Sequence, residues 1–312
     1  MKIIFFGTSA FAVNALRGLT ESGHEVAAVV TRPDRKKGRS LNLACSPVKD
    51  EALKREIPVL QPADLREAGF TARLNGVGAD IFVVVAYGNL LRKDLLEMPH
   101  ICSLNIHASL LPKYRGAAPV KWAIVSGEKK TGVTIMRIND KLDAGDIVLQ
   151  KEVKIGPRET SVELDSRLSG IGAGLLLEAI RLIETGKAEY RPQDEQNATY
   201  APKITKEDGH VDWKMCTEEI INRIRGFKPW PGTYSYYGGR VLKIIEAVAQ
   251  GGEGFSRFTP GQIAIADIES GLVVRTGDGA VSIKELQIEG KRRMNTELFL
   301  RGRKLKKGTT LA

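Results

Sequence analysis

The sequence predicts an α/β fold in which a doubly wound sheet domain precedes a smaller β-barrel or β-sandwich domain. Three observations favour this fold. In roughly the first 150 residues, short apolar runs alternate with helical stretches, the pattern of strand–helix–strand units. One of these runs, 80–88, is apolar along almost its whole length, as expected of a strand in the middle of a parallel sheet. The last third holds short β-rich segments separated by glycine and acidic residues.

The first domain is expected to alternate strands with helices. An apolar strand ends at Gly7, and an apolar pattern that reaches Leu19 follows, which predicts a strand, a tight turn and a helix. Helical stretches such as 46–54 fit between the strands, and apolar spacing predicts one long helix over 161–186. The strands are predicted at 2–6, 25–30, 57–60, 80–88, 101–107, 131–138 and 146–153, with a turn over 139–145.

The second domain is expected to follow a polar connection. Residues 189–209 are polar and aperiodic, so we divide the chain into a first domain over 1–189, a linker over 190–208 and a second domain over 209–312. The second domain begins with a predicted helix and a turn-rich crossing, over 218–227 and 229–239. Its β segments are predicted at 240–248, 261–266, 271–275 and 280–288.

A strand that ends in polar residues marks the strongest candidate site. Asn105 and His107 are two residues apart at the end of the strand over 101–107, so their side chains lie on one face of it. In open α/β sheets, ligands bind at the carboxyl ends of the strands. Asp143 follows in a loop between two strands, from which its carboxylate can reach the imidazole.

These three residue types suit the transfer of an acyl-type group. An amide N–H and an imidazolium stabilise a developing oxyanion, and a carboxylate beside them can handle the proton of an attacking amine. No serine or cysteine stands out as a nucleophile, which favours direct transfer over a covalent intermediate. A structural histidine hydrogen-bonded at a strand end is the alternative.

The glycine turn near the N-terminus does not predict a dinucleotide site. That fingerprint needs further glycines close to the pyrophosphate, but Ser9 and Phe11 occupy the following positions. The second strand ends in Thr31 and Arg32 rather than in an acid for the ribose. We therefore expect a plain strand-to-helix turn.

The net charge of +10 favours a polyanionic partner. Residues 201–312 hold 19 basic and 13 acidic residues and so carry six of the ten excess charges. A nucleic-acid footprint and a solvated basic surface both explain such a distribution. The basic residues gather in a run that begins at Lys291, Arg292 and Arg293, and in a long connection over 32–49 that contains Arg35, Lys36, Lys37 and Arg39.

The cysteines and the apolar runs predict no metal site, disulfide framework or membrane segment. Cys45, Cys102 and Cys216 stand far apart, without the paired spacing of zinc ligands or of a disulfide framework. No apolar run approaches the roughly 18 residues that span a bilayer, and no signal peptide is recognisable at the N-terminus. A reducing, cytoplasmic location is therefore expected.

The stretch from Ser103 to Ile124, together with 131–147, resembles the folate-dependent formyltransferase family. It contains Asn-x-His on a strand, a Ser-Leu-Leu-Pro turn, an Arg-Gly-Ala-x-Pro helix start and a Leu-Asp-x-Gly-Asp loop. The resemblance runs nearly end to end. The segments 5–13, 32–49, 83–91, 199–213 and 225–234 are similar to the members that act on methionyl initiator tRNA.

This resemblance implies a Rossmann-like domain, a C-terminal barrel of the oligonucleotide-binding (OB) type, a monomer without metal, and a folate co-substrate. The implied reaction moves the formyl group of 10-formyltetrahydrofolate to the α-amino group of methionine on initiator tRNA. The catalytic residues carried over are Asn105, His107 and Asp143. The folate contacts are Ser109, Leu110, Leu111 and Pro112, with Ala86, Tyr87, Gly88 and Leu90.

Contacts to tRNA are expected from the loop and from the second domain. Arg39 falls where the family places an arginine that engages the acceptor end, but Ser40, Leu41 and Asn42 follow it where relatives often have lysines. The expected contacts are therefore Arg35, Lys36, Lys37, Arg39, Lys203, Lys206, Lys291, Arg292 and Arg293. A formyltransferase for a small amine, a formyl-folate hydrolase and an inactive RNA-binding protein remain as alternatives.

Overall fold

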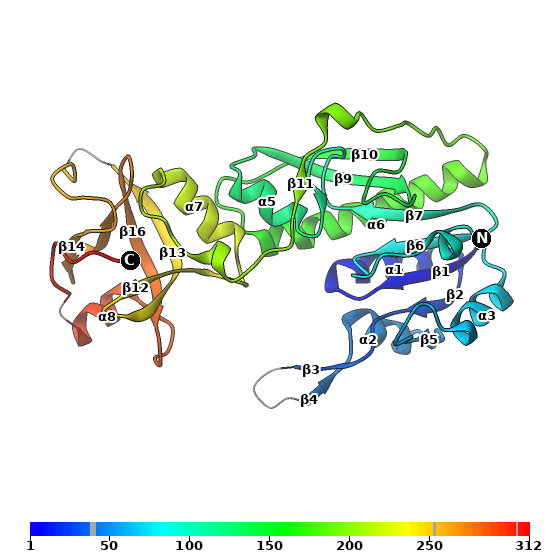
Figure 1. Cartoon of the computed structure of the whole chain (residues 1–312), viewed down its shortest axis with the longest axis horizontal. Helices are drawn as coiled ribbons and strands as arrows, with labels where there is room; N and C mark the ends of the chain where they lie inside the picture. Colours follow the sequence, from blue (N-terminus) through cyan, green and yellow to red (C-terminus); the bar gives the residue numbers. More distant parts are fainter. Residues whose placement is uncertain (38–41, 252–253, 304) are drawn as a thin grey trace. The chain divides into compact units, whose positions relative to one another are not determined.

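The computed structural model describes residues 1–37, 42–251, 254–303 and 305–312. The chain forms two compact units (Figure 1). The first comprises Met1–Pro119, Lys130–Lys154 and Leu164–Pro202, and the second comprises Val120–Lys129, Ile155–Glu163 and Lys203–Ala312.

A seven-stranded sheet forms the centre of the first unit and confirms the α/β prediction. Its order is β10-β9-β7-β6-β1-β2-β5, with parallel pairing from β5 to β7 and antiparallel pairing of β9 and β10. The strands are β1 (Lys2–Gly7), β2 (Glu25–Val30), β5 (Val59–Leu60), β6 (Ile81–Val85), β7 (Cys102–His107), β9 (Lys130–Arg137) and β10 (Ile147–Lys154). The chain runs outward from β1 through β2 and β5 and then returns to β6 on the other side, so the strand order reverses between β1 and β6. In open α/β sheets, ligands bind at the carboxyl ends of the strands at such a point.

Helices cover both faces of this sheet. On one face, Phe6 and Phe82 pack with Leu74 of α3 (Ala68–Val77) and with α4 (Lys93–Leu96). On the other face lie α1 (Val13–Glu21) and the first-unit part of α6 (Ser161–Glu184), where Gly172 approaches Ile106 so closely that a side chain would collide with it. The strand periodicity therefore sends Asn105 and His107 away from the α6 face. Shorter elements of this unit are η1 (Ala10–Ala12), α2 (Pro47–Lys54), β8 (Arg115–Gly116), η2 (Glu195–Asn197) and β11 (Tyr200–Ala201). The helix α5 (Pro119–Val125) belongs to the second unit except for its first residue.

A buried carboxylate joins α1 to α2. Glu51 accepts hydrogen bonds from Nε and Nη2 of Arg17, at 2.7 and 2.8 Å, and from Nε of Arg55 at 2.9 Å. The hydrogen bonds from Arg17 are the largest cause that lowers the pKa of Glu51 from 4.5 to about 2. Because this pKa is lower in the folded than in the unfolded chain, the stabilisation is present above pH 4.5 and is lost as the pH falls toward 2.

We expect Glu51→Gln to lower the free energy of unfolding by about 2 kcal/mol at pH 7, because it removes charge-assisted hydrogen bonds from a buried site. Between pH 4.5 and 2 the free energy of unfolding should also fall less in the variant than in the parent chain, because glutamine does not take up a proton. Denaturant titrations across this range measure both effects, with Glu178→Gln on an exposed position as the control. Parallel pH profiles for the variant and the parent chain would contradict this assignment.

The segment predicted as a long basic connection contains a β-hairpin, β3 (Arg35–Lys37) and β4 (Asn42–Ala44), which projects beyond α2 in Figure 1. Its base is fixed by Asp34, which accepts hydrogen bonds from Lys49 Nζ at 2.6 Å and from Gln61 Nε2 at 2.8 Å. Ser46 caps α2 by accepting the Lys49 N–H, and Pro47 occupies the first helical turn. The hairpin therefore emerges from a rigid base.

The second unit is built on an antiparallel sheet with the order β12-β13-β16-β15-β14, and β17 pairs with β16. Its strands are β12 (Thr233–Tyr237), β13 (Arg240–Gln250), β14 (Ile263–Asp267), β15 (Gly271–Arg275), β16 (Ala280–Ile288) and β17 (Met294–Asn295). The expectation of a turn-rich crossing over 229–239 missed β12, which alternates buried and more exposed residues. In the described part of the chain β12 and β14 do not pair with each other, so the sheet is not closed.

The core of this unit lies between the sheet and its helices. Ile220 and Ile224 of α7 (Thr217–Gly226) and Phe299 of α8 (Thr296–Gly302) are buried against sheet residues. A third short helix, η3 (Glu207–Gly209), precedes α7. The segments 120–129 and 155–163 also belong to this unit, and Trp122 packs edge-on against Phe227 at 5.9 Å between ring centroids.

None of the helices in the described ranges is long and apolar enough to cross a membrane.

Candidate active site

Asn105 and His107 lie at the carboxyl end of β7, where β7 stands between β6 and β9. His107 is buried and Asn105 is half-buried. Leu104 and Ile106, which alternate with them, are buried on the other face. No other described residue forms a hydrogen bond with the Asn105 side chain, so its amide remains available to a ligand.

A backbone carbonyl orients the ring of His107. Its Nε2 lies 2.9 Å from the carbonyl oxygen of Tyr114, and because a carbonyl only accepts, Nε2 carries a proton and donates it. The other ring nitrogen, Nδ1, lies 3.7 Å from Oδ2 of Asp143. Nδ1 is therefore the ring atom that can exchange a proton beside the carboxylate.

Asp143 occupies the tight loop between β9 and β10 with a positive φ of 48°. Its Oδ2 accepts the Gly116 N–H at 2.8 Å, and its backbone oxygen accepts Nε2–H of Gln193 at 2.9 Å. Gly145 follows, where a Cβ atom would stand 1.7 Å from the Arg137 oxygen, so only glycine fits there. The structure thus brings together the three residues of the expected catalytic set.

The turn over 109–112 packs against β9 and β10. Thr134 donates its hydroxyl to the Ser109 oxygen at 2.7 Å and accepts the Leu111 N–H at 3.1 Å. Gln150 donates to the Leu111 oxygen at 2.8 Å. Leu110 lies against Gly132, and a cis peptide bond joins Leu111 to Pro112. The hydrogen bonds from Thr134 and Gln150 fix the backbone of the segment that the sequence predicts to contact folate.

The second set of expected folate contacts lies at the end of β6. Ala86 and Gly88 both have positive φ, 44° and 87°, so the chain turns sharply there. Tyr87 is buried edge-on against Phe6, and burial raises the pKa of its phenol. Leu90 is exposed. The neighbouring ends of β6 and β7 therefore carry both expected folate-binding segments and the Asn105 and His107 side chains.

The basic residues expected to contact tRNA lie in both units. In the hairpin, Arg35, Lys36 and Lys37 form β3, and Arg39 lies outside the described residues. Exposed positions in the second unit are Lys203, Lys206, Lys291, Arg292 and Arg293. Glu285 accepts hydrogen bonds from Arg293, which raise the pKa of this guanidinium, so Arg293 already has an anionic partner.

The described residues include no cluster of three or more side chains suited to hold a metal ion. Cys102 starts β7 at the end away from His107, and burial raises the pKa of its thiol, which makes it a poor nucleophile. A cavity of about 400 Å³ at the same end is lined by Cys102, Ser103 and Arg137. It lies at the opposite end of β7 from the candidate site.

Sequence patterns missed four groups that shape this site: the Tyr114 oxygen, the Gly116 N–H, Arg115 and Gln193. Gln193 falls in the polar segment that we interpreted as a linker, where no periodicity marks a packed side chain. In the structure residues 190–202 lie in the first unit. Arg115 stands in the Arg-Gly-Ala-x-Pro motif of the sequence, but only the structure shows that its side chain is buried.

Comparison with protein families finds two matches. A model described as formyl transferase matches residues 1–180, and one described as formyl transferase, C-terminal domain, matches residues 203–304. Among curated proteins, methionyl-tRNA formyltransferase of Agathobacter rectalis is 43% identical over 309 residues, which cover 99% of this chain and 99% of that protein. The protein of the same name from Syntrophus aciditrophicus is 44% identical over 313 residues, covering 100% and 99%.

Among solved structures, HypX from Aquifex aeolicus in complex with tetrahydrofolic acid superimposes with a TM-score of 0.65 at 20% sequence identity. The match covers 96% of this chain and 47% of HypX, so the chain spans about half of that protein. At this identity the similarity concerns the fold.

Proposed function

Because the chain belongs to the formyl transferase family, we propose that it transfers the formyl group of 10-formyltetrahydrofolate to the α-amino group of methionyl initiator tRNA. The observation that supports this most directly is the meeting of Asn105, His107 and Asp143 at the carboxyl end of β7. The full-length similarity to methionyl-tRNA formyltransferases supports the choice of acceptor.

In the proposed reaction the neutral amine attacks the formyl carbon and forms the new C–N bond. The carbonyl oxygen gains negative charge, and the Asn105 side-chain N–H stabilises it together with the protonated Nδ1 of His107. The bond from the formyl carbon to N10 of the folate then breaks. The products are the formylated amine and tetrahydrofolate.

One proton leaves the amine and one reaches N10, so the reaction is balanced without a further reactant. Asp143 accepts the amine proton, directly or through water, and Nδ1 of His107 is the adjacent ring atom that can pass it on. Nε2 takes no part, because it donates to the Tyr114 oxygen. No metal is needed for these steps.

Ser109, Leu110, Leu111 and Pro112, with Ala86, Tyr87, Gly88 and Leu90, form the proposed folate-binding segments. The bonds from Thr134 and Gln150 hold the first of them in place before folate binds. We classify the first domain as Rossmann-like and the second, over 209–312, as OB-like with a role in tRNA binding. The proposed enzyme is a cytoplasmic monomer, in keeping with a charged tRNA as its substrate.

The test is transfer of labelled formyl from 10-formyltetrahydrofolate to methionyl initiator tRNA, free methionine and deacylated tRNA in parallel. The proposal predicts label only on the charged tRNA. Label on a small amine would indicate a different acceptor, and release of formate alone would indicate a hydrolase. Binding of tRNA without any folate turnover would instead indicate an inactive RNA-binding protein.

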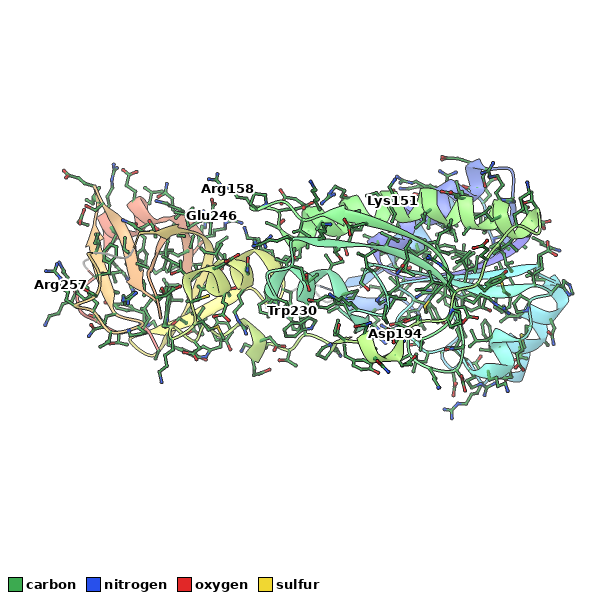
Figure 2. The ribbon with its side chains drawn as sticks, turned by 90° about the horizontal axis from the view of Figure 1, so that it is seen from above. Lys151, Arg158, Asp194, Trp230, Glu246 and Arg257 are labelled. Atoms are coloured by element: carbon green, nitrogen blue, oxygen red, sulfur yellow. The ribbon has the colours of Figure 1, made fainter. Side chains whose placement is uncertain are left out.

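Binding of tRNA should weaken steeply with salt, because contacts to phosphate release counterions. The double variant Lys291→Ala, Arg292→Ala is expected to lower the slope of log affinity against log salt by about 1 to 2. Its kcat at saturating tRNA should stay unchanged. Filter-binding titrations measure the slope, with Lys151→Ala, at an exposed position of β10 in the first unit (Figure 2), as the control. An affinity for tRNA that does not change with salt concentration would show that Lys291 and Arg292 do not contact its phosphates.

A further inference from the structure

We infer that Gln193 is a positioning residue, which sets the Asp143 carboxylate for the proton transfer while Arg115 holds the Gln193 amide in one orientation. This inference rests on the proposed function. The evidence is a continuous chain of hydrogen bonds within the first unit, from the catalytic loop to a segment some 50 residues further along the sequence.

The loop that carries Asp143 needs support from outside. Its positive φ of 48° is uncommon for a residue with a side chain and persists where surrounding contacts hold it. One amide supplies two of these contacts, because Gln193 Nε2 donates to the Asp143 oxygen at 2.9 Å and to the Gly145 oxygen at 2.8 Å. The Gln193 amide therefore joins the two sides of the turn.

Arg115 prevents this amide from turning over. Its Nε and Nη2 donate to Oε1 of Gln193 at 3.0 and 2.8 Å, so the oxygen must face the guanidinium and the NH₂ group must face the loop. Nη1 and Nη2 of Arg115 also donate to the Glu195 carboxylate, both at 2.9 Å. This carboxylate raises the pKa of Arg115, which is only 2% exposed and keeps its charge.

The segment that supplies Gln193 is itself fixed. Asp194, labelled in Figure 2, caps η2 by accepting the Gln196 N–H at 3.0 Å, which orders the turn that holds Glu195. Beyond it, β11 pairs with β8, and the Arg115 N–H donates to the Thr199 oxygen at 2.8 Å. Arg115 thus meets this segment through both its backbone and its side chain.

Three consecutive residues therefore control the candidate site. The Tyr114 oxygen orients His107, the Gly116 N–H binds the Asp143 carboxylate, and Arg115 between them fixes Gln193 and so the backbone of Asp143. A shift of the loop would change the distance between Nδ1 of His107 and Oδ2 of Asp143. A displacement of about 1 Å in such a site can reduce a rate about 100-fold.

The first test is Gln193→Met, which keeps the size of the side chain and removes its hydrogen bonds. We expect kcat for formyl transfer to fall about 10- to 100-fold, with the KM for both substrates within about threefold of the parent. Gln193→Glu is the second variant. It keeps an acceptor for Arg115 but points an oxygen at the two loop carbonyls, and it should lose at least as much activity. Gln196→Met, exposed on the same segment, is the control and should keep full activity.

A positioning role also predicts that Gln193→Met no longer lowers kcat when the Asp143 carboxylate is absent. In an Asp143→Asn background, Gln193→Met should cost less than about threefold in kcat, because the group that Gln193 positions is gone. An equal loss in both backgrounds, or kcat within about threefold of the parent for Gln193→Met and Gln193→Glu, would overturn the inference. If the parent chain itself transfers no formyl, the proposed function fails, and this inference fails with it.

Discussion

Replacing Asp143 by asparagine is expected to lower the single-turnover rate of formyl transfer about 100- to 10,000-fold, the range for loss of a positioned general base. The fold should be unaffected. The amide oxygen of the substituted side chain can still accept the Gly116 N–H, and the backbone bond to Gln193 does not involve the side chain. Because Oδ2 both accepts the Gly116 N–H and lies nearest Nδ1 of His107, the amide oxygen takes its place, and the variant loses the negative charge and the capacity to accept a proton beside the ring.

Rapid-quench assays with enzyme in excess over methionyl-tRNA measure this loss. Asp140→Asn, at an exposed position of the same loop, removes one negative charge without touching His107 and should stay within about twofold of the parent. If the two variants lost activity equally, loop charge in general and not the Asp143 carboxylate would explain the effect. If neither lost activity, Asp143 would have no part in the proton transfer.

Asn105→Ala is expected to lower the same rate about 100- to 1,000-fold, the cost of one oxyanion donor. The Asn105 side chain is half-buried at the end of β7 and forms no hydrogen bond with any described residue. Its removal therefore breaks no internal bond, and the midpoint of thermal unfolding should change little. Asn105→Asp, which replaces the donor by an acceptor, should be at least as slow.

The affinity for 10-formyltetrahydrofolate separates the role of Asn105 in the transition state from a role in binding. We expect the dissociation constant of the Asn105→Ala variant to change less than about fivefold, because the donor acts on charge that develops only during the reaction. Asn75→Ala, exposed on α3, is the control for the substitution itself. Loss of folate affinity equal to the loss of rate would make Asn105 a binding residue instead.

The parallel strands and the central pair of site residues could be predicted from sequence because strand periodicity is local. The apolar runs at β1, β2, β6 and β7 identify strands, and alternation along β7 places Asn105 and His107 on one face. The strand β12 was missed because Pro229, Pro231 and Gly232 precede it and suggest turns. Its residues form a strand by pairing with β13, a contact that composition does not show.

The supporting contacts of the site could not be predicted because they join distant segments. Gln193 reaches the loop of Asp143 from 50 residues away, and nothing in its polar surroundings marks it. The second unit also takes in 120–129 and 155–163, whose sequences continue elements of the first unit. Contacts of this kind depend on tertiary packing, which the spacing of apolar residues along the sequence does not predict.

The central claim is that Asn105 and Asp143 act on one formyl transfer at the end of β7, and the double variant Asn105→Ala, Asp143→Asn tests it most directly. The measurement is its single-turnover transfer from 10-formyltetrahydrofolate to methionyl initiator tRNA, with the binding of each substrate measured separately. We predict transfer at least about 1,000-fold slower than in the parent chain, with both substrates still bound. Transfer within about tenfold of the parent would contradict the account and place the chemistry elsewhere in the chain.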